Sequence, residues 1–368
     1  MVAPLNTQRI SGFYCYTPEE QKRLRKIYRG VESVMEDVLN YNYTSFPTVG
    51  LIEDFEKEMD HFKMNAQVFK IQDTPYFLKP TSESVAYPIV FSNTALQLPH
   101  KWYSVGPVFR NESKAVQRMV RNRQIRYFFE SHAFFKTKLQ AEKQIKDVLN
   151  EMKLYFEALG IFGQIRLRPI EDTFPGAEKT FAIDVPLENG KAAQVCTMHY
   201  LGTRFSEIYS NNKISAHGVC MGFTERVLGI QRSLYNEALK WIDNPYSIIS
   251  FGLKDKKENT LKPELKGVYS WAIRENQRTT EEVKKYIQLY TPCFYFLYGP
   301  KEKKGALDIR YIHVETNEVF ENLETVTKCI TQKRHTLLEN MKKLCIQRGK
   351  KLSNEVYGDP ISVENIQL

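Results

Sequence analysis

Two long strand-like segments, separated by a polar and basic stretch, dominate the first half of the chain. Residues 101–112, "KWYSVGPVFRNE", and residues 123–135, "RQIRYFFESHAFF", are rich in aromatic and β-branched side chains, as strands usually are. The segment between them, "SKAVQRMVRN", is polar and basic. The two segments therefore predict an antiparallel pair with a long loop, and this pair requires a sheet around it.

Apolar residues at helical spacing predict helices on both sides of this pair. Leu24, Ile27 and Val31 follow the three-and-four spacing of an amphipathic helix within residues 18–39. A similar pattern over residues 139–159 stops at a glycine, which commonly ends a helix. Further strands are expected over residues 163–170, 179–187 and 191–202, before "GVCMGFTERVLG" opens another helical pattern. The first domain is thus expected to be α+β with an antiparallel sheet.

The pattern of residue types changes near Asn244 and Pro245. Strand-like and helix-like stretches alternate from there over about 100 residues, which predicts a small, separate α/β domain. We expect domains over residues 1–243 and 244–350, followed by a short tail over residues 351–368. The lysine groups "KDKK" and "KEKK" fall in expected loops of the second domain, where a solvated loop is the simplest interpretation.

Composition narrows the class of protein. The formal net charge of +9 favours a basic surface that meets an anion, with nucleic acid as the first candidate and plain solubility as the alternative. The six cysteines are scattered without a Cys-x-x-Cys pair, so neither a disulfide framework nor a zinc knuckle is expected. No apolar run approaches the ~20 residues of a membrane span. We expect a soluble, cytoplasmic protein without a membrane partner.

Several arginines and carboxylates fall where the two long strands end. Arg110 and Glu112 close the first strand, Arg121 precedes the second, and Arg123 begins it. A guanidinium makes two charge-assisted hydrogen bonds at once, which suits a polyphosphate. A solvent-facing, arginine-rich hairpin is the alternative. Arg226, in "GFTER", is placed to meet a phosphate or an adenine face, although this short motif is weak by itself.

Strand alternation groups the remaining candidates. Counting in twos from Arg126 puts Phe128, Glu130 and His132 on one face, where a carboxylate and an imidazole between aromatic rings can hold an ammonium group. A structural histidine is the alternative. In residues 191–202, alternation puts Gln194 with Cys196 and Met198 on one face and Thr197 with His199 on the other, and either face might simply pack.

Taken in order, these pieces resemble the catalytic domain of class II aminoacyl-tRNA synthetases, and the prolyl-tRNA synthetase family most closely. "NYTSFP" resembles motif 1, "FRNE" through "FFESH" motif 2, and "GFTER" motif 3. "LKPTSES" resembles the family's Pro-Thr-Ser-Glu signature, and "QVCTMHYLG" its Gln-x-x-Thr-Ser-His-Tyr-Leu-Gly segment with Met198 in place of serine. Residues 289–318 are similar to the family's anticodon-binding domain, although Lys301 and Glu302 replace Arg and Asp.

The resemblance implies an ATP-dependent ligase that activates proline and transfers it to the 3′ end of tRNA, with Mg²⁺ brought by ATP and a homodimer formed through motif 1. It implies an amino-acid pocket of Thr81, Glu83, Glu130, His132, Thr197 and His199. It implies catalytic roles for Arg110 and Arg226. It implies ATP binding by Arg110, Glu112, Arg121, Arg123, Ile125, Gln194, Glu225 and Arg226, with Glu225 also a candidate magnesium contact.

Several departures from the family pattern stand out. One extra residue separates "RNRQI" from "ESH". Either a β-bulge restores the alternation and keeps Arg121, Arg123 and Ile125 in the nucleotide site, which we favour, or Arg126 and Phe128 take over. Ile125 stands where the family has a phenylalanine that stacks on adenine. The zinc-binding cysteine of the threonyl family is missing, so zinc is not expected. The editing insertion and the His-Gly-Asp segment after motif 3 are also missing. The alternative function is a catalytically inactive, synthetase-like paralogue that binds RNA or a polymerase.

Overall fold

The chain forms two compact units, which are described separately below. The computed structural model describes residues 8–62, 68–92, 96–242, 248–253, 269–273, 284, 287, 292–297 and 311–368. The first unit contains Met1–Leu234 and Lys343–Leu368, and the second contains Tyr235–Lys342. Residues 351–368, expected as a separate tail, are therefore part of the first unit. Among the described helices, none is both long and apolar enough to cross a membrane.

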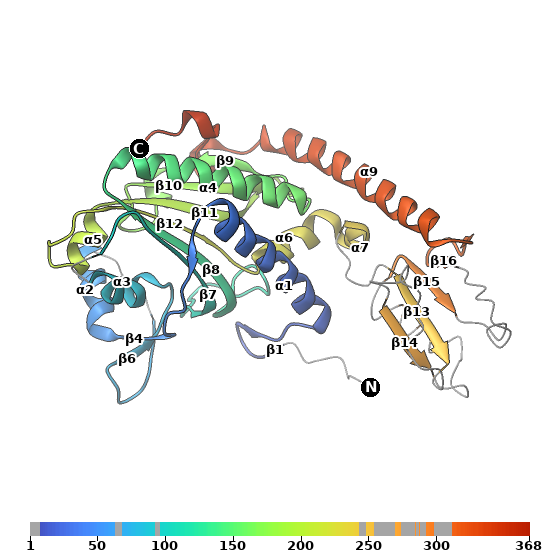
Figure 1. Ribbon diagram of the computed structural model, residues 1–368, viewed down its shortest axis with the longest axis horizontal. Coiled ribbons are helices and arrows are strands. Elements are labelled where there is room, and N and C mark those ends of the chain that lie inside the picture. Colours follow the sequence, from blue (N-terminus) through green and yellow to red (C-terminus); the bar gives the residue numbers. More distant parts are fainter. Residues whose placement is uncertain are drawn as a thin grey trace. The chain divides into compact units, whose positions relative to one another are not determined.

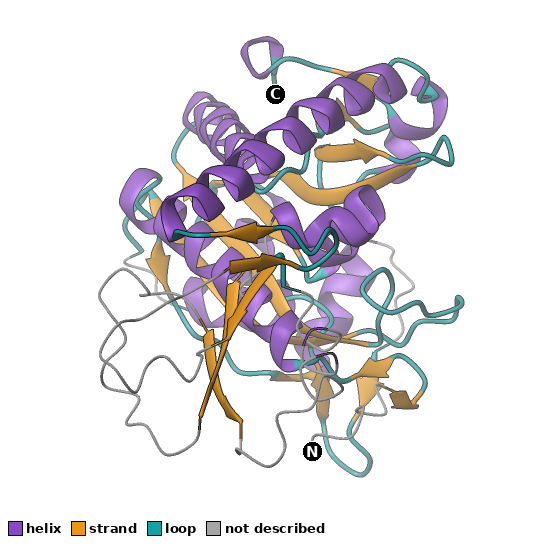
Figure 2. Ribbon diagram, turned by 90° about the vertical axis from the view of Figure 1, so that its right-hand side faces the viewer, coloured by secondary structure: helices purple, strands orange, loops and turns teal. Residues whose placement is uncertain are grey.

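A large, mostly antiparallel sheet is the centre of the first unit, as the two strand-like segments predict (Figure 2). In spatial order its strands are β18 (Asp359–Pro360), β9 (Gln164–Leu167), β10 (Lys179–Pro186), β11 (Ala192–Gly202), β12 (His217–Phe223), β8 (Gln124–Phe135), β7 (His100–Phe109) and β3 (Asn42–Tyr43). The pairing of β3 with β7 is parallel, and the other neighbours are antiparallel. The predicted antiparallel pair is thus β7 with β8, near the β3 edge of this sheet.

Two helices predicted from apolar spacing lie where expected. Helix α1 (Pro18–Ser33), extended by a π-helical turn (Val34–Val38), starts at a capping box in which Thr17 and Glu20 satisfy each other's backbone amides. Helix α4 (Lys138–Ala158) starts in the same way at Thr137 and lies across the sheet (Figure 1). The ring of Phe156 packs edge-on against that of Phe223 in β12. One face of the sheet is therefore covered by α4, and the opposite face remains for a site.

Shorter elements complete the first unit. A hairpin forms at the N-terminal end, a small three-stranded sheet lies beside two helices, and two further helices follow β11 and β12. These elements are β1 (Gln8–Ile10), β2 (Phe13–Tyr14), β4 (Val49–Leu51), α2 (Ile52–Phe62), β5 (Phe69–Lys70), β6 (Tyr76–Leu78), α3 (Glu83–Phe91), α5 (Arg204–Tyr209), α6 (Arg226–Tyr235) and α10 (Asn354–Tyr357).

The C-terminal residues are held on the edge of the large sheet by a buried arginine. Arg166, 1% exposed, donates to the main-chain oxygen of Gly358 at 2.7 Å and to that of Gly349 at 3.2 Å. Strand β18 pairs with β9 on the same edge. Because an unpaired buried guanidinium is costly, these contacts explain why the expected tail docks on the first unit.

The second unit has a five-stranded mixed sheet and a small core of its own. Its elements are α7 (Leu239–Ile242), β13 (Ile248–Leu253), β14 (Tyr269–Ile273), β15 (Phe294–Leu297), β16 (Tyr311–His313), β17 (Val319–Phe320) and the start of α9 (Leu323–Gly349). Strands β13, β14 and β15 pair in parallel, and the rest antiparallel. Trp241, Phe294 and Tyr311 belong to its core. The two lysine groups and Gly299–Glu302 lie outside the described residues.

A buried carboxyl in α2 predicts a pH-dependent stability. Glu58 is 4% exposed and accepts a hydrogen bond of 2.7 Å from the Tyr209 hydroxyl. Burial, followed by the nearby charge of Glu83, raises the pKa of Glu58 to about 8. The unfolded chain releases this proton at about pH 4.3, so the stabilising contribution of the neutral carboxyl is complete below that pH and is lost as the pH rises through about 8.

We expect Glu58→Gln to remove this part of the pH dependence. The free energy of unfolding, measured by urea denaturation across this pH range, should fall less steeply with rising pH in the variant than in the wild type. The exposed Glu56 on the same helix, paired with Lys70 at 3.6 Å, gives the matched control Glu56→Gln, which should follow the wild-type curve. Equal slopes for wild type and Glu58→Gln would contradict the assignment.

Candidate active site

A cavity of about 480 Å³ opens on the face of the sheet opposite α4. Its walls come from β8, β11 and β12, from the start of α3, and from the turn after β9. Nearly all of the residues proposed from the amino-acid motifs line it: Thr81, Glu83, Glu130, His132, Thr197 and His199, together with Arg110, Gln194 and Arg226. Motifs that lie up to about 140 residues apart in the sequence therefore meet in one cavity.

A β-bulge in β8 restores the alternation that the extra residue disrupts, as we favour from the sequence. Gly106 of β7 faces Phe128, but Val108 faces Ile125, so β8 has one residue more than β7 in this interval. Both bulge amides donate to the carboxylate of Glu225: the amide of Arg126 at 3.1 Å and that of Tyr127 at 3.3 Å. Residues on either side of the bulge therefore keep the phase of a regular strand relative to the cavity.

Glu225 is fully engaged in holding this bulge. Besides the two amides, it accepts a hydrogen bond of 3.0 Å from the hydroxyl of Tyr16, and its side chain is buried. Burial raises the pKa of Glu225, and the hydrogen bonds from Arg126, Tyr16 and Tyr127 act in the opposite direction. A carboxylate used in this way positions the strand, so the geometry gives little support to the expectation that Glu225 contacts magnesium.

A small cavity of about 40 Å³ adjoins the first and gathers the residues expected at ATP. Its lining includes Arg110, Glu112, Arg121, Ile125, Glu225 and Arg226. Arg121 and Glu112 form an ion pair at 3.8 Å. The guanidinium of Arg226 donates twice to the main-chain oxygen of Val120, at 3.0 and 2.7 Å. These two hydrogen bonds to one oxygen fix the direction of the Arg226 side chain.

Arg123 differs from the other predicted arginines. Its guanidinium donates to the main-chain oxygens of Ser11 at 3.0 Å and Glu112 at 3.1 Å, and it lines neither cavity. It therefore ties the N-terminal hairpin to the end of β7. Arg126, the alternative candidate, is exposed, and its Nε donates to the oxygen of Tyr14 at 3.2 Å.

The acid and imidazole of β8 form a rigid, buried corner of the large cavity. The ring of Trp102 stacks on that of His132 with centroids 5.3 Å apart, and the Tyr87 hydroxyl lies 2.8 Å from His132 Nδ1. Glu130 accepts hydrogen bonds from the amide of Ser82, at 3.0 Å, and from its hydroxyl. Burial lowers the pKa of His132 to about 4 and raises that of Glu130 to about 7.

One expectation for β11 is wrong. Relative to β10, β11 has an extra residue, because Ile183 faces Cys196 while Asp184 faces Gln194. This irregularity breaks the alternation that put Gln194 on the face opposite Thr197 and His199, and all three line the cavity. His199 is held by a contact of 2.9 Å between its Nδ1 and the Thr180 hydroxyl. Burial lowers the pKa of His199 to about 3.

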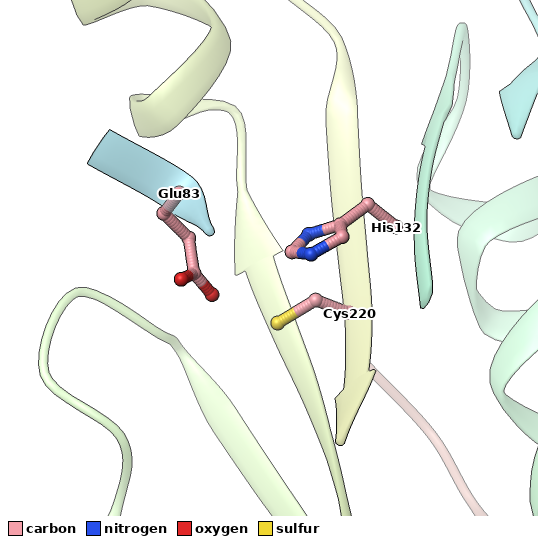
Figure 3. Close-up of side chains that lie close together, drawn as sticks. All are labelled: Glu83, His132 and Cys220. Atoms are coloured by element: carbon pink, nitrogen blue, oxygen red, sulfur yellow. The ribbon is translucent and has the colours of Figure 1, made fainter. Parts of the chain in front are cut away.

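Strand alternation placed Phe128 on the cavity face with Glu130 and His132, but the sequence patterns missed the lining residues Arg168 and Cys220. Phe128 lies under the guanidinium of Arg110, with 5.2 Å from Cζ to the ring centroid. Arg168 bridges to Asp184 at 2.7 Å, and Cys220 comes from β12 and lies beside Glu83 and His132 (Figure 3). Lys79 and Ser82 line neither cavity, but Ser82 holds Glu130, and both belong to the same "LKPTSES" stretch as Thr81 and Glu83.

Comparison with known proteins agrees with this geometry. Residues 62–234 match the family described as "tRNA synthetase class II core domain (G, H, P, S and T)". These residues are therefore similar to the core domain of class II tRNA synthetases. The chain is 30% identical over 236 residues to the proline–tRNA ligase of Methanocaldococcus jannaschii, covering 60% of this chain and 52% of that protein. It is 31% identical over 235 residues to that of Pyrobaculum calidifontis, covering 59% and 47%.

The chain thus spans about half the length of the curated relatives that it matches. Its fold is similar to that of the prolyl-tRNA synthetase of Cryptosporidium parvum in complex with halofuginone and AMPPNP. The TM-score is 0.74 at 21% identity, covering 92% of this chain and 75% of that one. The resemblance of the class II core to the prolyl-tRNA synthetase family is confirmed by these relatives.

The hydrogen bonds that Glu225 accepts at the β8 bulge lead to a stability prediction. Glu225→Ala leaves two buried amides and the Tyr16 hydroxyl without this acceptor, so we expect a loss of about 3 kcal/mol in the free energy of unfolding. Tyr16→Phe removes one of these three donors and also the acceptor of the Asn122 amide, and should cost about 2 kcal/mol. Chemical denaturation of the two variants and the wild type measures both values. A Glu225→Ala variant as stable as Tyr16→Phe would show that the bulge does not depend on the carboxylate.

Proposed function

We propose that this chain is a prolyl-tRNA synthetase-like ligase, which activates proline with ATP and transfers it to the 3′ end of tRNA. The main support for the proposal is that two cavities with chemically different linings adjoin each other. An arginine-lined pocket opens beside a cavity whose inner corner combines carboxylates, a neutral imidazole and aromatic rings. Nucleotide phosphates and an amino acid with its ammonium group need these two environments side by side. The curated relatives are named proline–tRNA ligases.

In the ATP half we assign Arg110 to the α-phosphate and Arg226 with Arg121 to the terminal phosphate. Glu112 accepts the adenine amino group, and Ile125 forms the wall beside the base. Gln194 is the candidate ribose contact. Arg123 acts by positioning Glu112 through the main chain. One of the similar solved structures is titled as a complex with L-proline and AMP, and another with the ATP analogue AMPPNP, which supports the use of ATP here.

In the amino-acid half we assign Thr81, Glu83, Glu130, His132, Thr197 and His199 to proline. Glu83 and Glu130 supply negative charge for the secondary ammonium, balanced in part by the buried Lys79, whose Nζ lies 3.3 Å from the Ser82 hydroxyl. The low pKa of His132, caused by burial, keeps its ring neutral at pH 7 and leaves the positive charge of the substrate unopposed there.

The chemistry follows from this placement. A carboxylate oxygen of proline attacks the α-phosphorus of ATP, the bond to the bridging oxygen breaks, and pyrophosphate leaves with its electron pair. The hydroxyl of the tRNA terminal ribose then attacks the carbonyl carbon, and AMP leaves. Catalysis is positioning plus stabilisation of charge on the phosphoryl oxygens, which Arg110 supplies in the first step. A magnesium ion bound with ATP would supply positive charge to the departing pyrophosphate, beside the Arg226 and Arg121 side chains assigned to the terminal phosphate.

Partners and assembly are part of the same proposal. The basic loop over residues 114–126 and the second unit, as an anticodon-binding domain over residues 244–350, would contact tRNA, mainly at phosphates. A homodimer through motif 1 is supported by exposed apolar side chains at the edge of the sheet and beside it: Val38, Tyr43, Val49 and Leu51. All six cysteines are free, which suits a cytoplasmic location.

The inactive-paralogue alternative is not favoured. A purely RNA-binding descendant has no use for a buried cavity that combines acidic side chains with an arginine cluster. The relatives in the comparison bear the names of active ligases.

The decisive measurement is ATP–pyrophosphate exchange with each of the twenty amino acids, with and without tRNA. We expect exchange with proline, lowered at least about a hundredfold by Arg110→Ala, because this guanidinium stabilises the charge that develops on the phosphorus. The matched control is Arg126→Ala, which removes an exposed arginine of the same hairpin and should change the rate less than about twofold. Folded protein that catalyses no exchange with any amino acid would refute the proposed activity.

A further inference from the structure

The carboxylate of Glu20, in the first turn of α1, is a buried charge that the proposed chemistry does not use. The residue is 2% exposed and lines neither the amino-acid cavity nor the nucleotide cavity. A buried charge is costly unless hydrogen-bond donors surround it. The groups that donate to Glu20 therefore show what this charge holds in place.

Two arginines from distant parts of the chain donate to this carboxylate. Arg118, in the basic loop, donates from Nη1 to Oε1 at 2.8 Å and from Nη2 to Oε2, so the pair is bidentate. Arg232 of α6 donates to Oε1 at 2.7 Å. Burial raises the pKa of Glu20, but hydrogen bonds from Arg118 and the Thr17 amide, together with the charge of Arg232, bring it below its usual value. An ionised carboxylate thus ties the basic loop to two helices.

The guanidinium of Arg118 has further contacts with the N-terminal segment. Its Nη2 also donates to the main-chain oxygen of Cys15 at 3.0 Å, and its Cζ lies 5.1 Å from the centre of the Tyr16 ring. A planar guanidinium that meets a carboxylate, a carbonyl and an aromatic face at once is held in one orientation. The tip of the basic loop is therefore fixed at the start of α1.

The next residue shows that contacts outside the loop impose its shape. Met119 is 3% exposed and has a φ of +62°, a left-handed conformation that residues other than glycine rarely adopt. Its backbone lies close against α6, since a Cβ added at Gly229 would come within 3.1 Å of the Met119 oxygen. Arg232, which pairs with Glu20, also lies 3.6 Å from the Met119 sulfur. Such a conformation persists only where the surrounding structure holds it.

The loop tip in turn places two arginines at the nucleotide cavity. Gln117 and Arg121 pair across the tip, with amide-to-oxygen distances of 3.0 and 2.7 Å. The oxygen of Val120, which lies between them, accepts both hydrogen bonds from Arg226. Arg121 and Arg226 both line the nucleotide cavity. The position of the loop therefore sets the direction of two guanidiniums that we assign to ATP.

We propose that Glu20 is a positioning residue, which holds the basic loop through Arg118 and Arg232. In this conformation the loop presents Arg121 and Arg226 to the nucleotide. The hold on the loop follows from these contacts alone, whereas the effect on ATP rests on the proposed function. If ATP binds to the ordered loop, its apparent affinity falls in proportion to the fraction of chains in which the loop is ordered.

The first test measures the loop without ligand or turnover. Glu20→Gln removes the charge but keeps a side chain that suits the capping box at the start of α1. Amide hydrogen exchange over residues 114–123 should be at least about tenfold faster in this variant, because charge-assisted pairs are lost. The matched control is Glu19→Gln, which makes the same change one residue earlier, where the carboxylate pairs with Arg23 at 2.9 Å. This control should exchange as slowly as the wild type.

The second test measures the nucleotide. Calorimetric titration with AMPPNP and Mg²⁺ should give a Kd at least about fivefold higher for Glu20→Gln than for the wild type. In pyrophosphate exchange without tRNA, the KM for ATP should rise by a similar factor. The KM for proline and the rate at saturating ATP should change less than about twofold. A merely destabilised protein would instead lose rate in proportion to its folded fraction, with both KM values unchanged.

A double-variant cycle assigns the effect to the pair. Arg118→Ala should also speed hydrogen exchange of the loop and weaken AMPPNP binding. Because both substitutions break the same contact, the loss of affinity in the double variant should be clearly smaller than the product of the two single losses. Near-ultraviolet circular dichroism verifies that each variant is folded.

Two results would overturn the inference: a Glu20→Gln variant whose loop exchanges as slowly as that of the wild type, or a faster-exchanging loop with an unchanged Kd for AMPPNP. Failure of the proposed function gives a different result. Wild-type protein that binds AMPPNP but catalyses no exchange with any amino acid would refute the proposed activity alone. Hydrogen exchange needs no ligand, so it decides in every case whether Glu20 holds the loop.

Discussion

The carboxylate of Glu225 holds together the part of the sheet on which the site depends. Strand β8 carries residues that line the nucleotide pocket before its bulge and residues that line the amino-acid corner after it. Side chains alternate along a strand, so an uncompensated extra residue would turn Glu130 and His132 toward α4. The bulge absorbs that residue, and its two amides, which the ladder cannot satisfy, are satisfied by Glu225.

The hydrogen bonds of Glu225 also explain how distant parts of the chain are joined at the site. Glu225 reaches the bulge from the start of α6 and receives the Tyr16 hydroxyl from a residue 209 positions away. The hydroxyl of Tyr16 in turn accepts a hydrogen bond of 3.1 Å from Asn122 in the basic loop. The N-terminal segment, motif 2 and motif 3 are thus joined through one buried carboxylate. Loosening any of the three would change the phase of β8 relative to the cavity.

The sequence predicted the parts that depend on local pattern, and it failed where long-range contacts decide. The hairpin of β7 with β8 and the helix α4 follow from aromatic content and apolar period. The extra residue in β11 has no local signal, which is why Gln194 was assigned to the wrong face. Arg123 looked equivalent to Arg121, but the oxygens that bind its guanidinium belong to Ser11 and Glu112, and no motif announces them.

Lys79 shows how local sequence and long-range contacts combine at the inner end of the cavity. Its ammonium is 4% exposed, and burial lowers its pKa while the charges of Glu130 and Glu83 raise it. A charged lysine can be buried only where carboxylates lie beside it. A buried carboxylate in turn needs cations or hydrogen-bond donors beside it. The hydroxyl of Ser82 links the two kinds of group, since Lys79 lies 3.3 Å from it and it donates to Glu130.

The stretch "LKPTSES" therefore has a physical meaning beyond a turn. It supplies a cation, three hydroxyls and a carboxylate within seven residues, at the point where α3 begins. The amide and the hydroxyl of Ser82 donate to Glu130 of β8, Lys79 donates to the Ser82 hydroxyl, and the rings of Tyr87 and Trp102 pack edge to face. A corner built in this way is rigid and highly polar at once. A group that left one of its buried ions unmatched would be rejected by the cost of that ion.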